Sequence, residues 1–324
     1  MAHDSIVTLR GGAQISKFGV GTATFGGLYE SMSDEDSHEV VQTAIDLGVR
    51  YFDTAPHYGK GQSERRLGKL LTEYPRNSYV LSTKVGRLLV PKAKMNEVDQ
   101  DFADSDPLVE RLFDFSEEGI IRSFQESLER LGLERVDIVF IHDPDDHADQ
   151  AINVGYRALE RLRTMGLIKS IGVGMNQVEI PTRFVRETDI DVVLIAGRYT
   201  LLDQSAGIEL LPLAEKKGVS IIAAGILNSG ILANPGPGAH YDYMPASKQM
   251  IERAITLKKI FEGHRSDLSQ AAMQFPLRNS VVSGILVGCR TAKEVSENIA
   301  KFDDPVAQSA WDEFDAFISS AGKK

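Results

Sequence analysis

Cysteine, long apolar runs and basic charge are all scarce in this sequence of 324 residues. The single cysteine, Cys289, excludes an intrachain disulfide and offers no thiolate cluster for a metal ion. No apolar run approaches the roughly 18 residues that a membrane-spanning helix needs. The opening "MAHDSIVTLRGG" lacks the basic-then-apolar pattern of a secretory signal. These features predict a cytoplasmic protein in a reducing compartment, with no membrane partner.

The charge balance argues against a nucleic-acid partner. The formal net charge is −10, whereas phosphate backbones are bound by clustered Lys and Arg side chains. The hydrophobic content of 42% is enough for a sizeable core. The composition is therefore typical of a globular protein whose excess acidic charge serves solubility.

Strand-like apolar runs alternate with amphipathic helical runs along the whole chain. "IVTLR" and "AQISK", on either side of Gly11 and Gly12, predict an N-terminal hairpin. After the hairpin come eight strand-like runs, each followed by a helical pattern. This order predicts a (β/α)8 barrel with an N-terminal β-hairpin, forming a single domain over residues 1–324. A doubly wound parallel sheet is the alternative, and it fits the strand count less well.

Two longer connections interrupt the alternation. Residues 88–115 separate the third strand from its helix, and residues 228–246 follow the seventh strand. Both should lie over the carboxyl ends of the barrel strands, where barrel enzymes bind their ligands. We call them the first and the second excursion.

Three neighbouring strands each finish with an ionisable residue. Asp53 ends "RYFD", Lys84 ends "LSTK" and His142 ends "VFIH", and Tyr58 follows Asp53 in the next loop. The carboxyl ends of barrel strands share one mouth, so these side chains should converge. A nearby ammonium favours the phenolate form of a tyrosine, and a neutral histidine can hydrogen-bond a substrate oxygen. The set suits proton transfer to or from an oxygen whose carbon exchanges a hydride.

Simpler interpretations exist for each residue alone. A strand-terminal Asp often caps a turn, a Lys there often reaches solvent, and His57 is interpreted as an ordinary loop residue. "HDPDDH" suggests a metal site, but Pro144 and the loop context scatter the side chains, so no metal is predicted. Three glycines of "GVGTATFGG" fit a Rossmann loop only loosely, and close backbone packing at the barrel mouth is favoured.

The motifs "FDTAPHYG", "STKVG" and "FIHDPD" resemble those of the aldo-keto reductase family, in order and in spacing. The resemblance covers essentially the whole chain. It implies a (β/α)8 barrel that binds an extended nicotinamide cofactor without a Rossmann fold. It also implies roles for four residues: Tyr58 is the general acid or base, Lys84 lowers the pKa of Tyr58, Asp53 pairs with Lys84, and His142 orients the substrate oxygen.

"GVGMNQ", "LNSGIL" and "VGCRTAKEVSENI" resemble the branch of that family containing L-fucose, D-threo-aldose, L-galactose and pyridoxal dehydrogenases. That likeness implies oxidation of a cyclic hemiacetal to a lactone, with a sugar or an aldehyde as the small-molecule substrate. A broad NADPH-dependent aldehyde or ketone reductase is an alternative. A binding subunit that senses a nicotinamide cofactor is an alternative from another class. The sequence indicates no oligomeric state.

The resemblance also implies where the cofactor binds. Glu294 and Gly288 stand where NADPH-specific members often carry basic residues, which favours NAD, although Arg290 leaves NADP possible. Candidate substrate contacts are Met175, Tyr241, Tyr243, Gln62, Phe25 and the first excursion. The implied cofactor contacts are Thr22, Ala23, Asp53, Asn176, Gly288, Arg290, Glu294, Glu297 and Asn298.

Overall fold

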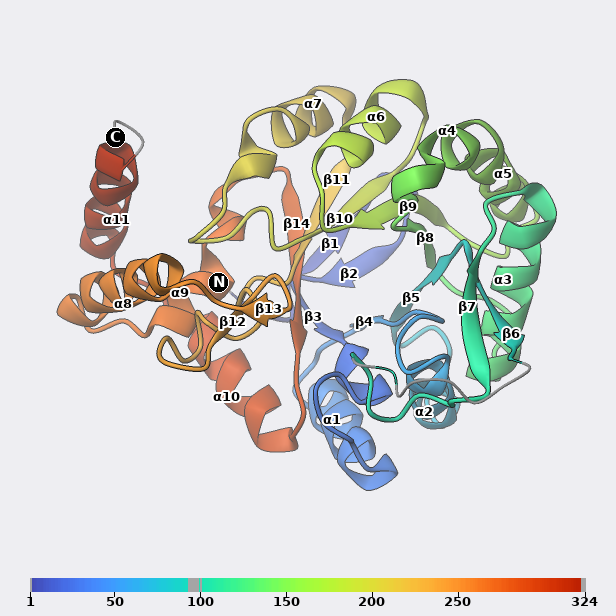
Figure 1. The fold of residues 1–324 in the computed structure, drawn as a ribbon, viewed down its shortest axis with the longest axis horizontal. Coiled ribbons are helices and arrows are strands. Elements are labelled where there is room, and N and C mark those ends of the chain that lie inside the picture. Colours follow the sequence, from blue (N-terminus) through green and yellow to red (C-terminus); the bar gives the residue numbers. More distant parts are fainter. Residues whose placement is uncertain (1, 93–98, 100, 322–324) are drawn as a thin grey trace.

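A closed barrel of eight parallel strands forms the centre of the molecule (Figure 1). The computed structural model describes residues 2–92, 99 and 101–321. Each barrel strand pairs with its neighbours in chain order, and the last strand pairs with the first. This confirms the predicted (β/α)8 barrel and excludes the doubly wound sheet. The barrel strands are β3 (Phe18–Gly21), β4 (Tyr51–Asp53), β5 (Val80–Val85), β8 (Ile138–His142), β9 (Ser170–Met175), β10 (Val192–Ala196), β11 (Ser220–Ala224) and β14 (Val282–Gly288).

Helices surround the barrel, and those packed on the strands share one apolar cluster with them, whereas the helices Lys248–Gly263, Leu268–Gln274 and Gln308–Ala321 contribute to a second cluster (Figure 1). Side-chain caps define several of their first residues, because Ser33, Ser116 and Thr291 each accept a hydrogen bond from a first-turn amide. Among the described residues, no helix is both long and apolar enough to cross a membrane. The helices are α1 (Asp34–Asp46), α2 (Gln62–Leu71), α3 (Glu117–Leu131), α4 (Ala148–Gln150), α5 (Tyr156–Thr164), α6 (Glu179–Glu187), α7 (Leu210–Lys217), α8 (Lys248–Gly263), α9 (Leu268–Gln274), α10 (Ala292–Asp303) and α11 (Gln308–Ala321).

The predicted N-terminal hairpin closes the end of the barrel where the strands begin. It consists of β1 (Ile6–Thr8) and β2 (Gln14–Ser16), paired antiparallel. Its buried Ile15 belongs to the same apolar cluster as Tyr51 and Phe140 of the barrel interior. Gly11 approaches Ser170, the first residue of β9, so closely that a Cβ would lie 2.4 Å from the Ser170 Oγ. The barrel is therefore a packed core at this end.

Both excursions contain short antiparallel hairpins, which the sequence analysis did not assign. In the first, β6 (Arg87–Pro91) pairs with β7 (Val109–Phe113). In the second, β12 (His240–Tyr241) pairs with β13 (Met244–Pro245). Residues 93–98 and 100 of the first excursion lie outside the described residues. The described parts of both connections therefore contain paired strands.

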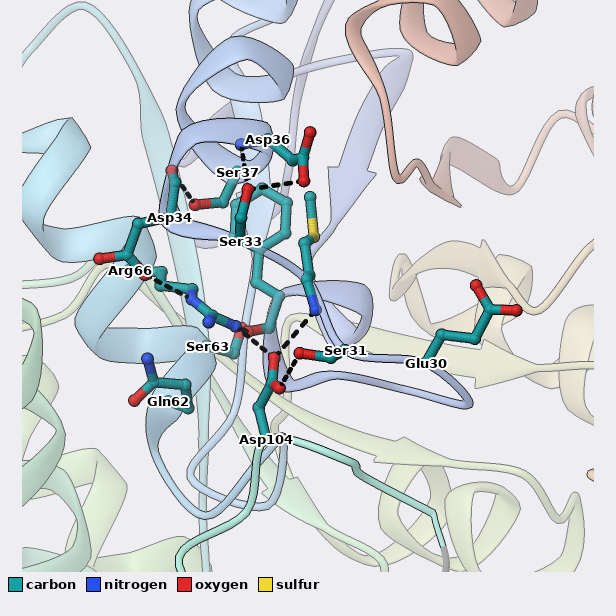
Figure 2. A network of polar contacts seen from close by, with 12 residues as sticks. Glu30, Ser31, Ser33, Asp34, Asp36, Ser37, Gln62, Ser63, Arg66 and Asp104 are labelled. Atoms are coloured by element: carbon teal, nitrogen blue, oxygen red, sulfur yellow. Dashed lines mark hydrogen bonds and ion pairs between the residues drawn. The ribbon is translucent and has the colours of Figure 1, made fainter.

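An ion-pair network ties the first excursion to the rest of the mouth (Figure 2). Arg66 of α2 pairs with Asp34 at 2.9 Å and with Asp104 of the excursion at 2.7 Å. Asp104 also accepts hydrogen bonds from the Ser31 hydroxyl and the Met32 amide. Three segments that are distant in sequence are thus held together beside the strand ends.

We predict that Ile15→Ala lowers the free energy of unfolding by about 2–4 kcal/mol, because it leaves a cavity where the hairpin closes the barrel. Ile6→Ala is the matched control, since Ile6 lies on the same hairpin and is 45% exposed. Its unfolding free energy should change by less than about 1 kcal/mol. Urea unfolding followed by circular dichroism measures both. Equal losses for the two variants would contradict a sealing role for the hairpin.

Candidate active site

The Lys84 ammonium lies at the centre of the predicted set. It donates to Asp53 Oδ2 at 2.6 Å, to Tyr58 Oη at 2.9 Å and to the Thr54 carbonyl at 3.0 Å. An ammonium has three donors, and all three are used here. The second oxygen of Asp53 accepts from the Ser82 hydroxyl at 2.6 Å, so the carboxylate is held as well. The strands therefore bring Asp53, Lys84 and Tyr58 into direct contact.

Burial and charge act in opposite directions on this group. Burial acts to lower the pKa of Lys84, but Asp53 and Tyr58 outweigh it and raise the pKa above its ordinary value. Burial raises the pKa of the Tyr58 phenol, and the Lys84 ammonium opposes that rise without cancelling it. Lys84 therefore stays charged, and its effect is to keep the phenol pKa lower than burial alone would set it.

Close backbone packing fixes the position of Tyr58. Gly59, the next residue, has a φ of 58°. A Cβ at Gly59 would lie 2.6 Å from the Gly26 Cα, so only glycine fits there. The Lys84 ammonium lies 4.6 Å from the centroid of the Tyr58 ring. The phenol is thus held both by its loop and by the ammonium.

His142 presents its ring edge-on to Tyr58, with centroids 6.1 Å apart and planes at 85°. Burial lowers its pKa well below the ordinary value, and the Arg87 and Lys84 cations lower it further. The imidazole is therefore neutral. Its Nδ1 has no partner among the described residues, whereas its Nε2 lies 3.4 Å from Asp143 Oδ2. That carboxylate favours the tautomer with the proton on Nε2.

His57 lies in the loop, as interpreted from the sequence, but it also lines the cavity above Tyr58. Its ring centroid is 5.7 Å from that of His142 and 5.2 Å from that of Phe102. Burial lowers the pKa of His57 to about 2, and Arg87, Arg111 and Lys84 contribute. A second neutral imidazole therefore faces the site.

The cavity has a volume of about 290 Å³. Of the candidate substrate contacts, Met175 and Tyr243 line it, and the first excursion contributes Asp101 and Phe102. Tyr241, Gln62 and Phe25 are not among its lining residues. The lining comprises Ala23, Leu28, His57, Tyr58, Lys84, Asp101, Phe102, His142, Asp143, Gly174, Met175, Asn176, Leu194, Ala196 and Tyr243.

Asp143 is a charged residue of the cavity wall that sequence reasoning missed. It directly follows His142, and the signal was present in "FIHDPD", where it was weighed only as a metal ligand. Burial raises the pKa of Asp143 to about 6, against the opposing effect of Arg87. Among the described residues, no cluster of three or more potential metal ligands exists. Asp143 instead pairs with Arg87, at 2.5 Å.

A groove of about 430 Å³ adjoins the cavity. Leu28 and Tyr243 line both spaces, so the groove lies next to the cavity that Tyr58 lines. Residues 225–230 form one side of it, and the start of α10 closes its far end. Of the implied cofactor contacts, the groove is lined by Gly288, Arg290 and Glu294.

The other implied cofactor contacts are placed differently. Ala23 and Asn176 line the cavity. The Thr22 hydroxyl is buried and bonds the Asp53 carbonyl at 2.9 Å. Glu297 is exposed and pairs with Lys293 at 3.6 Å, while Asn298 donates to Cys289 Sγ at 3.6 Å. Thr22, Glu297 and Asn298 do not line either space, and their part in cofactor binding stays a prediction.

Arg290 is already engaged with the protein. Its guanidinium donates to the carbonyls of Leu28, Glu30 and Ser31, at 3.1, 3.1 and 2.8 Å. Its own amide donates to Glu294 Oε2 at 2.7 Å. The end of the groove therefore presents a carboxylate beside a cation whose donors are largely taken.

Comparison with known proteins agrees with this geometry. The family model described as "Aldo/keto reductase family" matches residues 17–319. A D-threo-aldose 1-dehydrogenase from Pseudomonas sp. is 41% identical over 294 residues, covering 89% of each chain. A pyridoxal 4-dehydrogenase from Microbacterium luteolum is 39% identical, covering 93% of this chain and 94% of that protein.

A plant relative and a solved structure extend the comparison. An L-galactose dehydrogenase from Arabidopsis thaliana is 31% identical, covering 89% of this chain and 85% of that protein. The structure of a glycerol dehydrogenase from Gluconobacter oxydans superposes with a TM-score of 0.76 at 24% identity, covering 99% of this chain and 96% of the other, and shows the shared fold. The chain belongs to the aldo/keto reductase family and is an oxidoreductase of that family.

Proposed function

We propose that this protein oxidises the cyclic hemiacetal of an aldose, of the L-fucose or D-threo-aldose type, or of pyridoxal, to a lactone with NAD as hydride acceptor. The observation that carries the proposal is the contact of Tyr58 Oη with the Lys84 ammonium at 2.9 Å, in the wall of a cavity shared with His142. The names of the relatives at 41% and 39% identity supply the substrate class.

In this mechanism Tyr58 acts as the base. Its phenolate takes the proton of the anomeric hydroxyl, and the hydride leaves the anomeric carbon. Lys84 stabilises the phenolate, and Asp53 keeps Lys84 charged and oriented. His142, which is neutral, would hydrogen-bond the same substrate oxygen through its ring. A bound nicotinamide ring supplies the acceptor for the hydride.

The groove fits an extended dinucleotide. It is continuous with the cavity at Leu28 and Tyr243, so a ring at its inner end would lie close to Tyr58. Residues 225–230 include Gly225 and Gly230, which leave backbone exposed to a ligand. Asn176, which lines the cavity, offers an amide for polar contact with a nicotinamide group.

The far end of the groove supports a preference for NAD. Glu294 would repel a 2′-phosphate, whereas a carboxylate can accept hydrogen bonds from ribose hydroxyls. Arg290 is the cation that a phosphate would require, and its donors are bound to the carbonyls of Leu28, Glu30 and Ser31. A phosphate would share the guanidinium with these contacts.

A substrate panel tests the function. Absorbance at 340 nm with L-fucose, other aldoses, pyridoxal and simple aldehydes should show oxidation of a hemiacetal, with kcat/KM for NAD roughly tenfold or more above that for NADP, a difference of about 1.4 kcal/mol. Equal or better kcat/KM with NADP would contradict the cofactor preference. Turnover of simple aldehydes alone, with NADPH, would indicate the reductase alternative. Tight cofactor binding without any turnover would indicate the sensor.

Tyr58→Phe removes the proposed base while keeping the ring. We expect kcat to fall by at least about 100-fold, because proton transfer loses its acceptor. The Kd for the cofactor, from fluorescence titration, should change less than about twofold. Tyr79→Phe is the control, since Tyr79 directly precedes β5 at the opposite end of the barrel. Loss of cofactor binding in Tyr58→Phe would mean that the hydroxyl is structural.

Lys84→Met tests the source of the phenol pKa. Oxidation requires the phenolate, so its rate rises as pH increases through the pKa of Tyr58. Removing an opposite charge at this distance should raise that pKa by about 1–3 units. The pH–rate profile should then shift to higher pH, or the activity should be lost. Lys69→Met, on exposed α2 surface, should leave the profile in place. An unmoved profile in Lys84→Met would refute the assigned role.

A further inference from the structure

We propose that Asp143 recognises the hydroxyl on the carbon next to the reacting carbon, and so makes aldoses, rather than pyridoxal, the preferred substrates. The proposal rests on the function proposed above and names the substrate class for the same site. It gives Asp143 a direct contact with the substrate, separate from the roles of Tyr58, Lys84, Asp53 and His142.

The backbone of Asp143 is strained where the carboxylate enters the cavity. Its φ is 40°, a left-handed conformation that a non-glycine residue seldom adopts. The Asp143 amide donates to the Gly174 carbonyl at 3.1 Å, which holds the turn directly after β8. Strain of this kind is concentrated at ligand-binding sites, where the surrounding structure sustains it. The turn aims the side chain at the cavity instead of letting the strand continue.

The two oxygens of Asp143 have different surroundings. Oδ2 accepts from the Arg87 guanidinium at 2.5 Å and lies 3.4 Å from His142 Nε2. Oδ1 accepts no hydrogen bond from any of the described residues, and the side chain is 24% exposed. An ionised carboxylate has about four acceptor positions. Oδ1 is therefore available to a ligand hydroxyl inside the cavity.

Arg87 keeps the carboxylate in place without competing for the ligand. The Arg87 side chain is 10% exposed, and its guanidinium lies 4.9 Å from the Phe113 ring centroid. Both residues belong to the hairpin of the first excursion, so the hairpin holds the Arg87 guanidinium in position. Asp143 then presents a charged and immobile acceptor, for which little side-chain entropy is lost on binding.

The position of this acceptor selects which hydroxyl it can reach. In the proposed reaction the substrate oxygen would contact Tyr58 and His142, and Asp143 lines the same cavity with its Oδ2 3.4 Å from His142 Nε2. A hydroxyl on the carbon adjacent to the reacting carbon is the next polar group along an aldose. In pyridoxal that neighbouring atom is an aromatic ring carbon without a hydroxyl. Pyridoxal therefore lacks the hydroxyl that would bond Oδ1, and its kcat/KM should be lower.

The experiment compares Asp143→Asn with the wild type on two substrates: the aldose with the highest kcat/KM in the panel and its 2-deoxy analogue. The variant keeps the shape of the side chain, and Asn tolerates a positive φ. We expect the wild type to have a higher kcat/KM for the aldose than for the 2-deoxy sugar. In the variant the ratio of these two kcat/KM values should fall by about 10- to 100-fold, the range for a hydrogen bond to a charged group. Asp143→Gly, which also suits the backbone, should lose the preference as well.

Asp145→Asn is the matched control, because Asp145 is an exposed carboxylate two residues away that bonds Gln177 outside the cavity. It should retain the wild-type ratio. If Asp143 only anchors Arg87, Asp143→Asn and Asp143→Gly will lower the melting temperature or reduce kcat/KM equally for both substrates. The ratio of the two kcat/KM values will then stay unchanged. That result overturns the inference. The proposed function still holds in that case if the wild type oxidises an aldose. A wild type that oxidises no aldose overturns both.

Discussion

The buried contact of the Lys84 ammonium with Asp53 and Tyr58 is the constraint on which the site depends. An isolated charge at this depth would be very costly, so each member requires the others. The fold meets this requirement by pairing Asp53, the last residue of β4, with Ser82 of β5, and Lys84, two residues further along β5, places its ammonium 2.6 Å from the carboxylate. Removing Lys84 would leave Asp53 as an unpaired buried carboxylate, so such a variant loses stability as well as chemistry. Stability and reactivity are thus carried by the same three side chains.

Neutral imidazoles complete the electrostatic arrangement. Three cations, Lys84, Arg87 and Arg111, surround the two histidines, and burial together with these charges keeps His57 and His142 uncharged. A neutral histidine beside a cationic lysine can donate to a substrate oxygen without repelling the ammonium. The carboxylates of Asp53 and Asp143 balance the cations locally. The cavity is therefore polar, yet its charges are paired within the protein.

The barrel and the convergence of Asp53, Tyr58, Lys84 and His142 could be predicted from the sequence, because parallel strands of a barrel all end at one mouth. The hairpins in the two excursions could not. Their strands are short, two residues long in the case of β12 and β13, and pairing depends on contacts across the mouth rather than on local pattern. Asp143 was missed for a related reason: its direction is set by a left-handed turn, and Asp is not the residue that signals one most strongly. The expected contact of the cofactor with the backbone near Thr22 stays a prediction, and the Thr22 hydroxyl bonds the Asp53 carbonyl.

The closure of the barrel by the β1–β2 hairpin has a consequence for the sequence of binding events. Ile15 and its neighbours fill the lower end among the described residues, which leaves the mouth as the route for ligands to Tyr58. Leu28 and Tyr243 border both the groove and the cavity, so a sugar seated in the cavity would stand over the inner end of the groove. In the proposed reaction the dinucleotide and the sugar would therefore share one entrance, at the carboxyl ends of the strands.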